Sequence, residues 1–194
     1  GAVGGPESGP PLCGACTLNP PVLSHCTAAV DYAYPWDKLL HRFKFQGEVA
    51  WSHFFANAML QAPGADARLL QTDWVLPIPL SLERLGERGY NQSWELVKAF
   101  TRNHRHKARS DWLLKLADTP IQHELDHKER QRNLKDAFAT ASHAQIALAN
   151  STVLLVDDIM TTGATLHAAA LTLRRAGVAQ VNAMVFARTP APQP

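Results

Sequence analysis

Two adjacent carboxylates, Asp157 and Asp158, follow the apolar run 153–156 and precede a loop rich in Thr and Gly at 161–165. Carboxylates accept hydrogen bonds from a sugar diol, whereas hydroxyl groups and free backbone N–H groups donate to a phosphate. A glycine in such a loop lets the backbone come close to a ligand. These residue types in this order predict a site for a phosphorylated ligand. The alternative is that one acid caps the next helix, which leaves the other acid without a role.

The two acids need a strand to carry them and a helix to follow them. The run 153–156 has the length and β-branched content of a strand buried on both faces, as in a parallel sheet. After Gly163, an apolar stripe at helical spacing predicts a helix that ends before Gly177. The stripe consists of Leu166, Ala169, Ala170 and Leu173. Ligands of open α/β sheets bind outside the carboxyl ends of the strands, so we expect the acids and the loop at that edge.

Other segments complete an alternating order of strands and helices. The predicted elements are two helices within 32–60 around Gly47, a strand at 74–76 closed by Pro77 and Pro79, a helix over 94–100, a strand at 112–116, a polar helix over about 124–134 and a last strand at 181–187. The alternation implies a parallel sheet covered by helices. We therefore expect one α/β domain over 31–188, with an irregular segment at 1–30 and a disordered tail at 189–194.

The chain of 194 residues has a formal net charge of +2 and 46% hydrophobic residues, which is typical of an ordinary globular domain. It contains no apolar run near the roughly 20 residues of a membrane-spanning helix and opens with no secretory signal, so we expect a cytoplasmic protein. The net charge is too small to indicate nucleic-acid binding by itself. All three cysteines lie in the first 26 residues, and an odd number argues against a disulfide framework.

The stretch VLLVDDIMTTGAT, residues 153–165, resembles the phosphoribosyl pyrophosphate signature of type I phosphoribosyltransferases. The resemblance implies that Asp157 and Asp158 hold the ribose hydroxyls and that the following loop wraps the 5-phosphate. The loop residues are Thr161, Thr162, Gly163, Ala164 and Thr165. It also implies phosphoribosyl pyrophosphate as the ligand, with Mg2+ bridging the pyrophosphate and ribose oxygens.

Two further stretches resemble the ComF/GntX family of phosphoribosyltransferase-like proteins, which is associated with DNA uptake in bacteria. They are DWVLPIPLSLERLGERGYNQSWELVKAF at 73–100 and TPIQHELDHKERQRNLKDAF at 119–138. The resemblance covers roughly residues 13–188. It implies a type I phosphoribosyltransferase-like parallel sheet flanked by helices, with a short amino-terminal zinc-binding segment.

The Arg-rich loop of the first stretch leaves a predicted strand and enters a helix, so it should face the same rim as Asp157. Two guanidinium groups there, Arg84 and Arg88, suit a pyrophosphate because each can bind it bidentately. Further candidates for pyrophosphate or lid contacts are Gly89, Asn91, Gln92, Arg130, Arg132 and Asn133. The alternatives are a solvated loop whose arginines pair with neighbouring glutamates and, around 130–133, a solvated polar helix.

Cys13 and Cys16 have the spacing of half a structural zinc site, in which four ligands form a tetrahedron. ComF-like proteins carry two such pairs, so the resemblance implies that this chain starts after the first pair and that its Zn2+ site is incomplete. His25 and Cys26 could complete a Cys3His set, although their adjacency makes a tetrahedron awkward. The alternative is that these cysteines are reduced thiols without a metal.

The resemblance implies transfer or hydrolysis at ribose C1, with pyrophosphate as the leaving group and an unidentified acceptor. Asp157 and Asp158 would orient the ribose, and Arg84 and Arg88 would stabilise the leaving group. Positioning and charge neutralisation would then account for the acceleration of the reaction. No residue is an evident general base for the acceptor.

Two other functions stay open. One is a non-catalytic accessory protein of the competence machinery that binds the ligand or single-stranded DNA beside a helicase-like partner. Its phosphate contacts would lie in the basic run 102–109, which contains no aromatic residue to stack bases and is more simply a solvated helix end. The other is a nucleotide-salvage phosphoribosyltransferase without any link to DNA.

Overall fold

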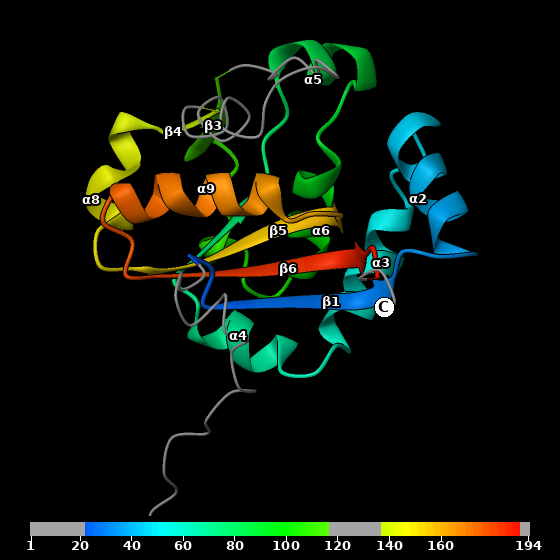
Figure 1. The fold of residues 1–194 in the computed structure, drawn as a ribbon, viewed down its shortest axis with the longest axis horizontal. Coiled ribbons are helices and arrows are strands. Elements are labelled where there is room, and N and C mark those ends of the chain that lie inside the picture. The colour runs from blue at the N-terminus through cyan, green and yellow to red at the C-terminus, as the bar shows by residue number, and fades with distance from the viewer. Residues whose placement is uncertain (1–21, 117–136, 191–194) are drawn as a thin grey trace, which may run out of the picture.

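A computed structural model describes residues 22–116 and 137–190 of the chain (Figure 1). Its centre is a four-stranded sheet in the order β1-β6-β5-β2, in which every neighbouring pair is parallel. The strands are β1 (His25–Asp31), β2 (Trp74–Pro77), β5 (Thr152–Met160) and β6 (Gln180–Arg188). Because they run in the same direction, their carboxyl ends meet at one edge of the sheet. Polar residues that follow different strands are thereby brought together.

Helices cover both faces of this sheet, and α2 stands beyond the carboxyl end of β1 (Figure 1). One face is covered by α8 (Gln145–Leu148), α9 (Ala164–Arg175) and a small antiparallel pair, β3 (Leu113–Lys115) and β4 (Phe138–Thr140). The other face is covered by α3 (Trp51–Leu60), α4 (Ala65–Gln71) and α6 (Gln92–Phe100), and α2 (Trp36–Phe45) packs into the same core at the end of the sheet. The remaining elements are α5 (Leu82–Arg88) and the 3-10 turns η1 (Arg105–Lys107) and η2 (Ser142–Ala144). Within the described ranges, no helix has the length and apolar character needed to cross a bilayer.

The strand that carries the two carboxylates is held from both sides. Val153 and Leu155 of β5 pack in the core under α9, whereas Leu154 and Val156 pack in the opposite core with α3 and α6. All four side chains are fully buried. Burying such a side chain contributes about 1.5–3 kcal/mol, so β5 is a firm support for the carboxylates at its end.

The α/β class and the parallel sheet predicted from the sequence are confirmed. The central strand is longer than predicted and reaches Met160, because Asp157 and Ile159 remain paired with β6. The predicted helix after Gly163 is α9. The two helices predicted around Gly47 are α2 and α3, and this glycine has a φ of 69°, which a residue without a side chain adopts most readily.

Two expectations are wrong. The irregular segment predicted at 1–30 does not extend over residues 25–30, which belong to β1 and pair with β6 at the edge of the sheet. This strand consists mostly of small and polar residues, so the tertiary pairing rather than the local pattern determines its conformation. The predicted Arg-rich loop contains the helix α5, whose first turn is capped by Ser81. The polar helix predicted near 124–134 lies outside the described residues.

The basic run 102–109 has a structural role at two of its positions. The Lys107 ammonium donates to the carbonyls of Leu69, Leu70 and Thr72, at distances of 3.1, 2.9 and 2.6 Å. These carbonyls lie at the end of α4, where backbone acceptors lack partners within the helix. The Arg109 guanidinium lies over the rings of Trp74 and Trp112, 4.6 and 5.1 Å from their centroids. Both cations therefore join this segment to the body of the fold.

We predict that Lys107→Met lowers the free energy of unfolding by about 2 kcal/mol, because three carbonyls lose a charged donor. Chemical denaturation of the purified variant measures this change. The matched control is Arg105→Met, which removes an exposed cation from the same turn and should stay within about 0.5 kcal/mol of the wild type. Equal effects of the two substitutions would contradict the structural role of Lys107.

Candidate functional site

The two carboxylates lie at the carboxyl end of β5, and both side chains are nearly inaccessible to solvent. Neither of them caps the next helix, since α9 begins after Gly163 without a side-chain cap. The capping alternative is therefore excluded for both residues. A buried carboxylate is unfavourable unless hydrogen bonds or a nearby cation compensate its charge, so the partners of this pair define the site.

Asp157 is compensated by hydrogen bonds. Its Oδ1 accepts from the Ser93 hydroxyl at 2.8 Å and from the backbone N–H of Asp158 at 2.9 Å. Burial, followed by the negative charge of Asp158, nevertheless raises the pKa of Asp157 to about 7, against the opposing effects of both hydrogen bonds and of Lys44. Near neutral pH this carboxyl thus exists in both its protonated and its ionised form.

Asp158 is compensated by a cation. Its Oδ2 lies 2.9 Å from the Lys44 ammonium, and its Oδ1 accepts from the backbone N–H of Ile159 at 2.8 Å. The exposed fractions of the two side chains are 18% for Lys44 and 3% for Asp158. Although Oδ2 is close to the ammonium, no donor in the described parts of the chain is directed at it as a hydrogen bond. This oxygen retains the capacity to accept one.

A cavity of about 340 Å³ opens beside Lys44. Its lining residues are Lys44, Phe45, Gly47, Arg84, Glu87 and Arg88. Three cations face one carboxylate in this lining, which makes the cavity suitable for a polyanion. The Arg88 guanidinium is positioned by the Phe45 ring, 5.0 Å from its centroid, and by the Gln92 side chain, to which it donates at 2.9 Å. The structure thus brings Arg84 and Arg88 to the edge that carries Asp158, as the sequence predicted.

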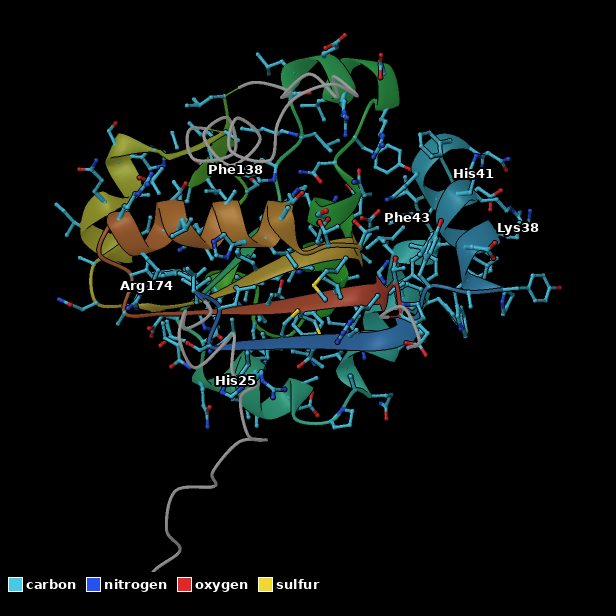
Figure 2. All side chains as sticks on the ribbon, viewed as in Figure 1. His25, Lys38, His41, Phe43, Phe138 and Arg174 are labelled. Atoms are coloured by element: carbon cyan, nitrogen blue, oxygen red, sulfur yellow. The ribbon has the colours of Figure 1, made fainter. Side chains whose placement is uncertain are left out.

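Helix α2 supplies Lys44 and Phe45 to this cavity from its last turn. Figure 2 shows Phe43 on the side of α2 that faces the body of the protein, with Lys38 and His41 on its outer side. The Tyr90 hydroxyl donates to the Phe43 carbonyl and ties this helix end to the segment that follows α5. Both cationic elements around the cavity are therefore linked to each other as well as to the sheet.

The predicted phosphate loop turns sharply between β5 and α9. Gly163 has a φ of 76°, so a side chain there would strain the backbone, while Thr161, Thr162 and Thr165 are exposed. The Thr162 hydroxyl accepts from the backbone N–H of Ala164 at 3.3 Å, and the first N–H groups of α9 point out of the helix. The loop places hydroxyl and N–H donors at the same strand end as the carboxylates.

Some predicted pyrophosphate residues have contacts within the scaffold. The Asn91 side chain caps α6 by accepting from the backbone N–H groups of Ser93 and Trp94, at 2.9 and 3.3 Å. Gln92 is buried and orients Arg88, and Gly89 ends α5 with a positive φ. The other predicted candidates lie outside the described residues; they are Arg130, Arg132, Asn133, Cys13 and Cys16.

Sequence reasoning missed Lys44 and Ser93. Ser93 directly follows the predicted pair Asn91 and Gln92, and Lys44 interrupts two aromatic residues at a helix end. The local sequence around these two residues does not predict their contacts with β5, because the strand is more than sixty residues away along the chain. Within the described ranges, no group of three or more His, Cys, Asp or Glu side chains could hold a metal ion by itself.

We predict that Asp157→Asn removes a pH dependence of stability. In the folded protein Asp157 holds its proton up to about pH 7, whereas in the unfolded chain it ionises near pH 3.8, so the wild type loses stability as the pH rises between these values. The melting temperature of the variant should therefore rise relative to that of the wild type from pH 5 to pH 7, by roughly 3 °C or more, and the gap should level off above pH 8.

Differential scanning calorimetry at each pH measures this gap. Asp66→Asn, a change at an exposed position of α4, is the matched control and should show a constant gap. A constant gap for Asp157→Asn as well would contradict the raised pKa.

Comparison with known proteins agrees with this geometry. The phosphoribosyl transferase domain family matches residues 113–194. The chain is 32% identical over 181 residues to the DNA utilization protein YhgH of Escherichia coli (strain K12), which covers 91% of this chain and 78% of that protein. It is 31% identical over 180 residues to competence protein F of Haemophilus influenzae, with the same coverage. Competence protein ComFC of Bacillus subtilis is 30% identical over 155 residues, 77% of this chain and 58% of that protein. The chain therefore belongs to the ComF/GntX family of phosphoribosyltransferase-like proteins.

Proposed function

We propose that this protein binds phosphoribosyl pyrophosphate with Mg2+ at the carboxyl edge of its sheet and transfers or hydrolyses at ribose C1. The observation that carries the proposal is the position of two buried carboxylates beside a cavity lined by Lys44, Arg84 and Arg88. One molecule with a diol, a monophosphate and a pyrophosphate matches the three kinds of group at this edge. A phosphoribosyl transferase domain in the family supports the same ligand.

In this proposal each part of the ligand meets a different part of the edge. Asp157 and Asp158 accept hydrogen bonds from the ribose hydroxyls, and the loop 161–165 donates to the 5-phosphate. Arg84 and Arg88 bind the pyrophosphate in the cavity. The ligand would then extend from the end of β5 to α5, and its C1 atom would lie between the carboxylates and the cavity.

The residues present fit Mg2+, which prefers one or two carboxylates together with phosphate oxygens. Asp157 and Asp158 would offer carboxylate oxygens at the end of β5, next to Lys44 of the cavity lining, and the ligand would supply the rest. When bound, the ion neutralises charge on the pyrophosphate and thereby makes it a better leaving group.

In the reaction the bond between C1 and the pyrophosphate oxygen breaks, and its electron pair leaves with the pyrophosphate. A new bond forms from C1 to the acceptor, which is water in hydrolysis and a second substrate in transfer, and the proton that the acceptor loses is released to the solvent. Arg84 and Arg88 hold the developing negative charge, while the carboxylates fix the ribose so that C1 faces the acceptor. The protein forms no covalent bond to the ligand.

We predict that Asp157→Asn/Asp158→Asn weakens the binding of phosphoribosyl pyrophosphate by at least about 100-fold, because two ionised acceptors of the diol are lost. Isothermal titration calorimetry in the presence of Mg2+ at pH 8, where Asp157 is mostly ionised, measures this loss. The control Asp66→Asn should bind like the wild type.

Absence of saturable binding by the folded wild type would reject the proposed function. If the wild type binds, pyrophosphate release in the presence of candidate acceptors separates the enzyme from a protein that only binds the ligand. Release with free bases or amines would favour a salvage enzyme.

We propose as a second role that the protein contacts single-stranded DNA, a role consistent with relatives named DNA utilization protein and competence protein F. Arg102 and Arg105 are exposed at the end of α6 and in η1, where they are accessible to phosphates. Lys107 and Arg109 are unsuitable for a test of this role, since their substitution would also destabilise the fold.

We predict that Arg102→Glu/Arg105→Glu weakens the binding of a single-stranded oligonucleotide by roughly 10-fold and reduces the dependence of binding on salt. Fluorescence anisotropy at two salt concentrations measures both quantities. Lys38→Glu/Arg175→Glu changes the net charge equally at exposed positions elsewhere and should have a smaller effect. Equal losses in the two variants would reject a DNA contact at 102–105.

A further inference from the structure

The Lys44 ammonium adjoins two places that can hold an anion, the Asp158 carboxylate and the cavity. Its ammonium lies 2.9 Å from the Asp158 carboxylate, and its side chain also lines the cavity that contains Arg84 and Arg88. One ammonium group cannot stay against Asp158 and at the same time lie fully within the cavity. Its position therefore depends on which of the two places contains the stronger anion.

In its present position Lys44 obstructs Asp158. The Asp158 side chain is 3% exposed, and its Oδ2 has no directed hydrogen bond from the described residues although it is an acceptor. A ribose hydroxyl can reach this oxygen only after the ammonium has moved. The cation thus stabilises the buried carboxylate and blocks the same atom that the proposed ligand requires.

The surroundings of Lys44 allow such a movement. It is the penultimate residue of α2, and Gly47 begins the connection to α3 three residues later. Its long side chain is partly exposed and has several rotatable bonds, so the ammonium can move while the helix stays in place. An anion in the cavity offers it a new partner beside two guanidinium groups, and hydroxyl donors offer Asp158 a new partner in return.

We propose that Lys44 is a placeholder cation, which holds Asp158 while the site is empty and transfers its contact to the pyrophosphate group when the ligand binds. This inference rests on the proposed function and adds a coupling between two parts of one site. Filling the cavity with an anion withdraws Lys44 from Asp158 and opens the ribose position. The two subsites therefore bind their groups cooperatively, and Lys44 is a positioning residue for this coupling.

The experiment measures ribose 5-phosphate binding to the full chain by calorimetry with Mg2+, with and without saturating inorganic pyrophosphate. In the wild type, pyrophosphate should tighten the binding of ribose 5-phosphate by about 10-fold. In Lys44→Met, ribose 5-phosphate alone should bind more tightly than to the wild type, since no cation has to be displaced, and pyrophosphate should no longer increase its affinity. Lys44→Gln keeps a polar donor and serves as a second variant in case Lys44→Met misfolds. It should change the affinity for ribose 5-phosphate and the effect of pyrophosphate in the same directions as Lys44→Met.

Lys38→Met is the matched control, because it removes an exposed ammonium from the same helix; it should behave like the wild type. Retention of the full coupling in both Lys44 variants would overturn the inference, as would an equal loss of affinity with and without pyrophosphate.

A separate measurement distinguishes this inference from the proposed function. Acylation of lysines followed by mass spectrometry reports how accessible each ammonium is in the empty protein. Asp158→Asn should increase the acylation rate of Lys44 several-fold and leave that of Lys38 unchanged, whether or not any ligand binds. If the wild type binds neither ligand, the proposed function fails. An acylation rate of Lys44 that Asp158→Asn leaves unchanged would overturn the role of Lys44 as the partner of Asp158.

Discussion

A buried carboxylate needs a compensating partner, and this protein places two of them side by side at the end of its central strand. Asp157 is compensated by the Ser93 hydroxyl and a backbone N–H, and Asp158 by the Lys44 ammonium. The two side-chain partners come from different helices that pack in the same core. The positions of α2 and α6 relative to β5 therefore matter for the charge of this pair, because separating either helix from the strand would remove the side-chain partner of a buried acid.

Helix α2 also lines the cationic cavity, together with α5. The last turn of α2 contributes Lys44 and Phe45, and the segment after α5 is tied to α2 through the hydroxyl of Tyr90. Arg88 is oriented by contacts with Phe45 and Gln92, so its position depends on both neighbouring elements. The Arg88 guanidinium is thus held in the cavity lining by contacts within the protein, so an anion there would meet it at little cost in reorganisation.

Local patterns in the sequence predicted the parts of the fold that local physics determines. The strand at 153–156, the helix after Gly163 and the two helices around Gly47 all follow from side-chain type and spacing. The common position of the carboxylate pair and the arginines at one edge of the sheet could be predicted, because each group follows a predicted strand. β1 could not, because its small residues acquire their conformation by pairing with β6. Ser93 and Lys44 could not either, since their roles arise only when distant segments meet at β5.

We propose that the carboxylates and the cationic cavity together form one site for phosphoribosyl pyrophosphate. The most direct test is a crystal structure of the protein with this ligand and Mg2+. We expect ribose hydroxyls within hydrogen-bond distance of Asp157 and Asp158, the pyrophosphate between Arg84 and Arg88, and the Lys44 ammonium on the pyrophosphate rather than on Asp158. A ligand bound elsewhere, or one bound here with Lys44 still against Asp158, would contradict this proposal.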